Sequence, residues 1–76
     1  MDRAAVLAAV IHALHEAHYS SDIVIREDMT LESLGLDSLD VLEIVFELED
    51  KLDVSVKDGE VLLRTTVGEL TDLFAA

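Results

Sequence analysis

Three stretches of the chain repeat apolar residues at intervals of three and four, the spacing that marks one face of an α-helix. They cover about residues 2–18, about residues 38–51 and the segment that starts at Thr66. The triplet Ile23-Val24-Ile25 has strand propensity, but no stretch of similar character could pair with it. The pattern therefore predicts an all-α fold, in which the triplet supplies loop side chains that plug the core.

Size and charge narrow the class of protein further. The 76 residues predict a single domain, residues 1–76, and 51% apolar residues are too many for a disordered chain. Acidic residues number 17 against 5 basic ones, so the formal net charge is −12. This charge disfavours nucleic acids and anionic membranes, and it favours partners with basic patches. The absence of cysteine excludes a disulfide framework and a thiolate metal site.

The sequence does not predict membrane insertion or export. The longest unbroken apolar run, residues 4–11, is too short to span a bilayer. Met1-Asp2-Arg3 lacks the basic region of a signal peptide, and Asp2 argues against a transit peptide. We expect a cytoplasmic monomer. A chain that starts at Met1 without flanking domains also predicts a discrete protein.

Capping residues stand at the start of each predicted helix. Asp2 can cap the first helix. Asp37 is the expected N-cap of the second helix, and Asp40 three residues later gives an acidic version of the capping box. Thr66 and Glu69 form a capping box at the last helix.

The connections between helices are expected to contribute to the core. Residues 19–36 form a long loop, a feature that is often functional in a small domain. We expect Leu31 and Leu34 to reach back from it into the core. A short helical turn is expected at about residues 58–63, although Gly59 weakens it. The prediction is three substantial helices and one short one.

The segment Leu34-Gly35-Leu36-Asp37-Ser38-Leu39-Asp40 places one serine where an extended turn enters a helix. We expect the Ser38 hydroxyl to be exposed, and the N–H groups and dipole of the helix N-terminus favour an anion there. No candidate general base lies nearby in sequence and no Gly-x-Ser-x-Gly elbow is present, which disfavours a hydrolase nucleophile. The arrangement suits a serine that is modified. The plainer alternative is an ordinary serine at a helix start.

The second predicted helix has two apolar stripes. The stripe expected to face the core is Val41, Ile44, Val45, Leu48 and Leu52. The other stripe is Leu39, Leu42 and Phe46, and it lies beside Asp40, Glu43, Glu47 and Asp50. A helix in a small bundle needs one apolar face, so the second stripe predicts a docking surface with an acidic rim. The alternative is that the long loop covers it.

The segment around Ser38 resembles the phosphopantetheine attachment motif of acyl carrier proteins, with Asp37-Ser38-Leu39 as its core. Residues 41–53 resemble the second helix of that family, and Arg64-Thr65-Thr66-Val67 resembles the segment that opens its last helix. Length, acidity and the order of helices and loops also agree. The resemblance covers nearly the whole chain.

The resemblance implies a small four-helix bundle with a long loop between the first two helices. It implies that Ser38 carries 4′-phosphopantetheine from coenzyme A through a phosphodiester, and that the terminal thiol of this arm carries an acyl group as a thioester. The implied cofactor-binding residues are Asp37, Ser38 and Leu39, and Asp37 would help the phosphopantetheinyl transferase hold its metal ion. The implied docking residues are Leu39, Asp40, Leu42, Glu43, Phe46 and Glu47.

The resemblance also implies a carrier without catalytic residues, which is not an enzyme. Its partners would be the phosphopantetheinyl transferase and then an acyltransferase, a ketosynthase and other synthase enzymes with basic docking patches. These enzymes would belong to dissociated fatty acid synthesis or to polyketide synthesis, including antibiotic pathways. Lys57 stands where the family often has proline, and together with the unusual first helix it leans toward a specialised pathway.

Two alternatives remain open on the sequence. One is a carrier of aminoacyl or peptidyl groups, although that motif more often has glycine or histidine at the position of Asp37. The other, from a different class, is an acidic helical adaptor that binds partners through Leu39, Leu42 and Phe46 without a prosthetic group.

Three histidines, His12, His15 and His18, recur on the first predicted helix, opposite its apolar face. Residues three apart drift around a helix, and no carboxylate completes a clear site with them. The acidic stretch of residues 53–60 does not match the ligand spacing of an EF-hand. We therefore predict a solvated face and no metal site.

Overall fold

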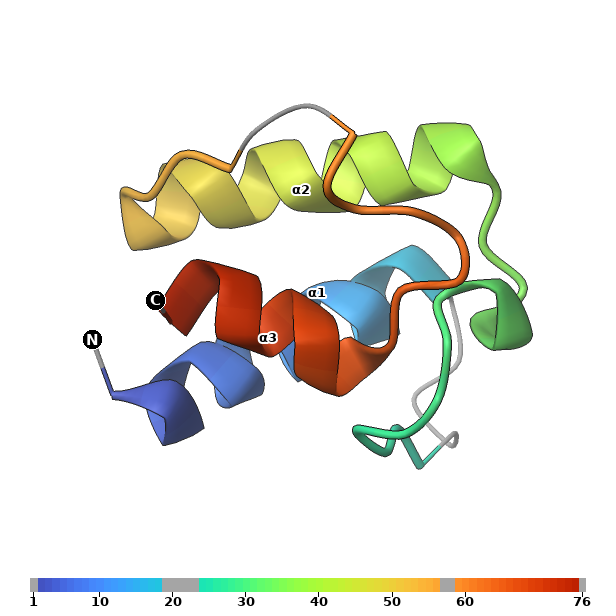
Figure 1. Ribbon diagram of the computed structural model, residues 1–76, viewed down its shortest axis with the longest axis horizontal. Coiled ribbons are helices and arrows are strands. Elements are labelled where there is room, and N and C mark those ends of the chain that lie inside the picture. Colours follow the sequence, from blue (N-terminus) through green and yellow to red (C-terminus); the bar gives the residue numbers. More distant parts are fainter. Residues whose placement is uncertain (1, 19–23, 57–58, 76) are drawn as a thin grey trace.

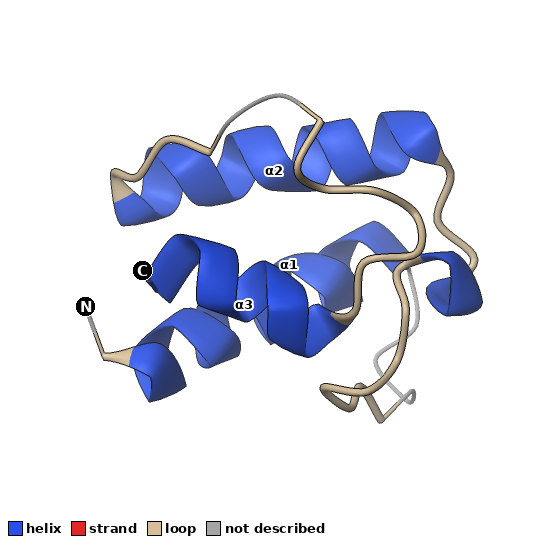
Figure 2. Ribbon diagram, in the orientation of Figure 1, coloured by secondary structure: helices blue, strands red, loops and turns tan. Residues whose placement is uncertain are grey.

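The computed structural model describes residues 2–18, 24–56 and 59–75. These ranges form the helices α1 (Arg3–His18), α2 (Ser38–Leu52) and α3 (Val67–Ala75), and a short 3₁₀ helix, η1 (Glu32–Leu34). Figure 2 shows helices joined by loops, and the described ranges contain no strand, only an isolated bridge between Thr30 and Thr66. The all-α prediction is confirmed, with helix limits close to those expected.

The apolar faces of the three helices meet in one core. α1 contacts both other helices, and in Figure 1 α2 runs along the top of the view while α3 lies below it, in front of α1. The buried helical residues are Val6, Val10, Ala13 and Leu14 of α1, Val41, Ile44 and Leu48 of α2, and Val67, Leu70 and Phe74 of α3. Their spacing of three and four is the one that the sequence predicted, with Val45, Leu52 and Leu73 half-buried at the margin.

The loop between α1 and α2 supplies further core side chains. Leu31 and Leu34 are 0% and 2% exposed, which confirms that they plug the core. The same prediction is wrong for Val24, which is 73% exposed. Ile25 is half-buried against the core, and Ile23 lies outside the described residues. Among the described loop residues, the first main-chain hydrogen bond to a distant segment is made by Glu27, whose carbonyl accepts from Gly68 N, so Val24 precedes the anchored part.

Two connections that are far apart in sequence are hydrogen-bonded to each other. The donors and acceptors are Leu31 N to Thr65 O, Glu32 N to Leu63 O, Val67 N to Met29 O and Gly68 N to Glu27 O, at 2.8–2.9 Å. The last two bonds satisfy amides at the N-terminus of α3, which would otherwise lack partners. A Cβ on Gly68 would lie 3.3 Å from the Glu27 carbonyl oxygen, so glycine permits this close approach.

η1 was not predicted, and it redirects the chain toward α2. Gly35 follows it in the left-handed conformation, with φ 81°, and donates its N–H to the Glu32 carbonyl at 3.0 Å. Leu36 is then buried immediately before the start of α2. A left-handed residue favours glycine because a Cβ is strained there.

The helical turn expected at residues 58–63 is wrong for residues 59–63, which form turns and irregular chain; Asp58 lies outside the described residues. Gly59 is left-handed, with φ 87°. Leu62 N donates to Thr65 Oγ1 at 2.9 Å, and the Leu63 carbonyl accepts from the loop before α2. These groups are therefore engaged outside any helix. A four-helix bundle is not confirmed, since the described part holds three α-helices and η1.

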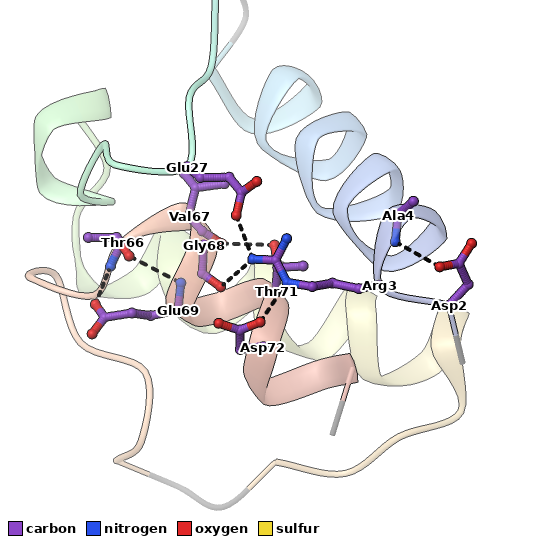
Figure 3. A network of polar contacts seen from close by, with 10 residues as sticks. All are labelled: Asp2, Arg3, Ala4, Glu27, Thr66, Val67, Gly68, Glu69, Thr71 and Asp72. Carbon is purple, nitrogen blue, oxygen red and sulfur yellow. Dashed lines mark hydrogen bonds and ion pairs between the residues drawn. The ribbon is translucent and has the colours of Figure 1, made fainter.

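Arg3 ties the start of α1 to α3 and to the loop before η1 (Figure 3). Its Nε donates to Asp72 Oδ1 at 2.6 Å, and its Nη2 donates to Glu27 Oε1 at 2.5 Å and to the Gly68 carbonyl at 3.5 Å. The hydrogen bond from Arg3 lowers the pKa of Glu27, and the hydrogen bonds to Glu27 and Asp72 raise the pKa of Arg3. All three side chains are partly exposed, so water screens these ion pairs.

None of the helices in the described ranges combines the length and the apolar character needed to cross a bilayer.

Candidate functional site

Ser38 is the first residue of α2, and a reciprocal pair of hydrogen bonds fixes the turn that presents it. Asp37 is the N-cap, and its Oδ1 accepts from Asp40 N at 2.8 Å, while Asp37 N donates to Asp40 Oδ2 at 3.1 Å. This confirms the predicted capping box, in which an aspartate replaces the usual glutamate or glutamine. Ser38 itself is exposed, between the buried Leu36 and Val41. The serine is thus accessible and held on an ordered backbone.

The amides of Ser38 and Leu39 donate no hydrogen bond to any other described residue. They are two of the N–H groups that every helix start leaves free. Together with the helix dipole, free amides beside the Ser38 hydroxyl favour an anionic group there. A phosphodiester on Ser38 fits this environment.

A serine nucleophile needs a general base within hydrogen-bonding reach. In the part of the chain that the structure describes, no side chain is hydrogen-bonded to Ser38. His12, on the exposed side of α1, pairs instead with Glu16 across 2.7 Å. The geometry thus favours a serine that receives a group over one that attacks.

A cavity of about 280 Å³ adjoins Ser38 and runs along α2, where the connection to α3 passes back beside the helix (Figure 1). Its lining residues are Ser38, Val41, Leu42, Val45, Phe46 and Glu49 of α2, and Val56, Gly59 and Val61 of the following connection. The side chains of the described lining residues are apolar apart from Ser38 and Glu49. The modified group would therefore start at the mouth of an apolar space.

This cavity was not predicted from the sequence, because its helical wall combines residues from both apolar stripes of α2, which were interpreted as separate surfaces. Val41 and Val45 belong to the predicted core stripe, whereas Leu42 and Phe46 belong to the exposed stripe. The fact that the two stripes adjoin each other on α2 is the sequence feature that could have indicated the cavity. The opposite wall, which includes Val56 and Val61, depends on how the chain returns after α2, and no helical pattern marks that.

Glu49 anchors the connection that follows α2. Its side-chain Oε2 accepts from Val56 N at 2.9 Å. Its main-chain carbonyl accepts from Asp53 N, at the left-handed C-cap of α2, and from Val54 N at 3.3 Å. One residue of α2 therefore fixes the chain at three points after the helix.

The second apolar stripe lies on the surface. Leu39, Leu42 and Phe46 are 62%, 46% and 58% exposed, so the alternative that the long loop covers them is wrong. Glu43 and Glu47 are exposed beside them, while Asp40 is half-buried and occupied in the capping box. Large exposed apolar side chains next to acids are the anatomy of a docking surface.

A shallow hollow of about 200 Å³ extends the acidic rim from α2 to α1. It is lined by Glu16, Ala17, Asp40, Glu43, Ile44 and Glu47. Glu16 was not among the predicted docking residues, because its proximity to α2 depends on how the helices pack. The predicted docking residues Asp40, Glu43 and Glu47 do line this hollow together.

The described histidines of α1, His12 and His15, are not among the residues that line the cavity along α2 or the acidic hollow beside it. His12 is exposed and His15 is half-buried, and the side chain of His18 lies outside what is described. Among the described residues, no three histidine, aspartate or glutamate side chains are grouped so that they could hold a metal ion.

Comparison with known proteins agrees with this geometry. A family model described as the phosphopantetheine attachment site matches residues 5–74. The chain is 38% identical over 56 residues to an acyl carrier protein of Sulfurovum sp. (strain NBC37-1), covering 74% of this chain and 75% of that protein. It is 49% identical over 39 residues to an acyl carrier protein of Campylobacter lari, covering 51% of each. It is also 45% identical over 60 residues to one part, 2% of the length, of a large polyunsaturated fatty acid synthase polypeptide of Thraustochytrium sp..

Proposed function

Because the chain belongs to the acyl carrier protein family, and is therefore a carrier rather than an enzyme, we propose that Ser38 holds its 4′-phosphopantetheine arm. The arm carries acyl groups as thioesters. The observation that carries the proposal is the position of Ser38, exposed at the start of α2, beside two free amides and at the mouth of an apolar cavity. The residues present fit the group, since the amides suit its phosphodiester and the cavity suits its cargo.

Asp37 serves the modification in two ways. Its side chain caps α2, which keeps the backbone of Ser38 in one conformation. Its exposed carboxylate also stands next to the serine in sequence, where it supplies a ligand for the metal ion of the phosphopantetheinyl transferase. The cap uses Oδ1, so the second oxygen is available to that ion.

The cavity along α2 shelters the acyl chain between encounters with enzymes. An apolar chain gains free energy with each methylene that leaves water, about 0.8 kcal/mol when burial is complete. A cavity of about 280 Å³ beside the attachment point is therefore a site for the cargo. Burial also keeps water away from the reactive part of the chain.

The exposed face of α2 receives partner enzymes. Leu39, Leu42 and Phe46 supply apolar contact, while Glu43, Glu47 and Asp40 attract basic patches. Partners of this chemistry are the transferase, an acyltransferase, a ketosynthase and other enzymes of fatty acid or polyketide synthesis. Location in the cytoplasm and a monomeric state stay predictions from the sequence.

The proposal is tested by incubating the protein with coenzyme A and a broad-specificity phosphopantetheinyl transferase, and recording the intact mass. We expect a gain of one phosphopantetheinyl group, abolished in Ser38→Ala. Ser33→Ala, which changes another exposed serine, in η1, is the matched control and should still be modified. No gain, or a gain that persists in Ser38→Ala, would refute the assignment.

The same modified protein distinguishes two alternative functions from that of an acyl carrier. An adaptor without a prosthetic group gains no mass and still binds partners through Leu39, Leu42 and Phe46. A carrier of aminoacyl or peptidyl groups gains the arm but is then loaded by amino-acid-activating enzymes and not by an acyltransferase. Asp37 before the serine and the acidic α2 favour the acyl carrier.

A further inference from the structure

The cavity along α2 has a polar end that the proposed function does not use. Ser38 and Glu49 are eleven positions apart on the helix, which places them about 16 Å apart along its axis. Between them the wall consists of Val41, Leu42, Val45 and Phe46. Among the described residues that line the cavity, Glu49 is the one ionisable side chain. The attachment point and a carboxylate therefore mark opposite ends of an apolar channel.

The carboxylate of Glu49 is fixed where it stands. Its Oε2 accepts from Val56 N at 2.9 Å, and this bond joins the helical wall of the cavity to the opposite wall. Glu49 is half-buried, so the bond is partly shielded from water. Separating the two groups inside an apolar space would leave an amide and a carboxylate without partners, which is costly.

We propose that Glu49, through its hydrogen bond to the Val56 amide, sets the greatest length of saturated acyl chain that this cavity accepts. The inference rests on the proposed function, because it takes the phosphopantetheine arm on Ser38 as the tether from which the acyl chain enters the cavity. Each added methylene gains burial until the chain end reaches Glu49. A longer chain must then strain or break the bond between that carboxylate and Val56 N, and this cost offsets the gain from burying another methylene.

The experiment uses the full chain, loaded at Ser38 with acyl-phosphopantetheine from a series of acyl-coenzyme A donors, from butyryl to palmitoyl. Intact mass confirms each loaded form before measurement. We expect the Tm to rise by roughly 3 °C for each buried methylene and then to level off at one chain length. At that length the Val56 amide, followed by NMR, should exchange its hydrogen roughly tenfold faster.

Two variants assign the limit to Glu49. Glu49→Leu has a similar size and no acceptor, so the Tm should continue to rise at chain lengths where the wild type has levelled off. Glu49→Gln is the matched control, since its amide oxygen can still accept from Val56, and it should level off where the wild type does. The Val56 exchange measurement needs no variant, so it tests the proposal even if Glu49→Leu is poorly folded.

The outcomes separate this inference from the proposed function. A protein that is not modified at Ser38 refutes both. A protein that loads normally but shows no levelling, the same levelling in Glu49→Leu, or unchanged Val56 exchange at all lengths keeps the carrier function and refutes the role of Glu49. A shift in Glu49→Gln as large as that in Glu49→Leu refutes the part played by the hydrogen bond.

Discussion

Arg3 Nε donates to Asp72 Oδ1 across 2.6 Å, and this bond joins residues 69 positions apart in the chain. The same guanidinium reaches Glu27 in the loop before η1, so one side chain links α1, α3 and that loop (Figure 3). The loop is hydrogen-bonded in turn to the N-terminus of α3. Arg3 therefore helps to hold α1, α3 and that loop together.

Glu27 should make stability depend on pH in a predictable window. Its folded pKa lies below the ordinary value of 4.5, so the folded state binds fewer protons at this group than the unfolded state. The stabilisation is complete above that ordinary value and is lost as the pH falls through the folded pKa. Glu27→Gln should lower the Tm at pH 7, and its difference from the wild type should shrink below about pH 5.

The comparison of variants is needed because acidification also relieves repulsion in a chain of net charge −12. Glu32→Gln, at another exposed carboxylate, is the matched control and should leave the Tm nearly unchanged at pH 7. Added salt should reduce the effect of Glu27→Gln, since the ion pair is partly exposed. A difference that persists undiminished at low pH would contradict the role of the Arg3 pair.

Asp37 should show separate effects on stability and on modification. Asp37→Ala removes the cap of α2 and should cost about 1 kcal/mol of unfolding free energy, measured by urea denaturation. Asp37→Asn keeps a good capping residue, so it should cost little stability. Both should slow phosphopantetheinylation roughly tenfold, because both lose the carboxylate proposed to bind the transferase metal. Normal loading of Asp37→Asn would remove that second role.

Leu31 and Val24 should respond in opposite ways to the same truncation. Leu31 is a loop residue whose side chain is fully buried in the core, so Leu31→Ala should cost about 3 kcal/mol, a large part of the stability of a small domain. Val24→Ala removes an exposed side chain and should change stability by less than about 0.5 kcal/mol. Denaturant titration of both variants measures the difference. Similar losses would mean that residues 24 and 31 are equally buried in solution.

Charge reversal on α2 should weaken docking without harming the fold. Glu43→Lys and Glu47→Lys place a positive charge beside Leu42 and Phe46, and each should weaken binding to the phosphopantetheinyl transferase roughly tenfold. Both positions are exposed, so circular dichroism and the Tm should change little. Asp28→Lys makes the same charge change on an exposed loop outside α2 and should bind normally. Equal binding by all three variants would argue against the docking face.

The three α-helices, their starts and the exposed serine could be predicted from the sequence alone. These features depend on local chemistry. Apolar spacing of three and four defines a helical face, and the pairs Asp37–Asp40 and Thr66–Glu69 close hydrogen bonds within four residues. Ser38 followed from the same local reasoning, because a residue next to an N-cap is exposed in most contexts. The resemblance to acyl carrier proteins then indicated that Ser38 carries phosphopantetheine.

Features that depend on how distant segments meet are visible only in the tertiary structure. The main chains before η1 and before α3 pair with each other, which places Leu31 in the core and engages Leu63, where a helical turn was expected. The return of the chain along α2 creates the second wall of the cavity, and Glu49 holds it through Val56. No local pattern encodes such contacts, because their free energy arises only when the helices have packed and both partners have left water.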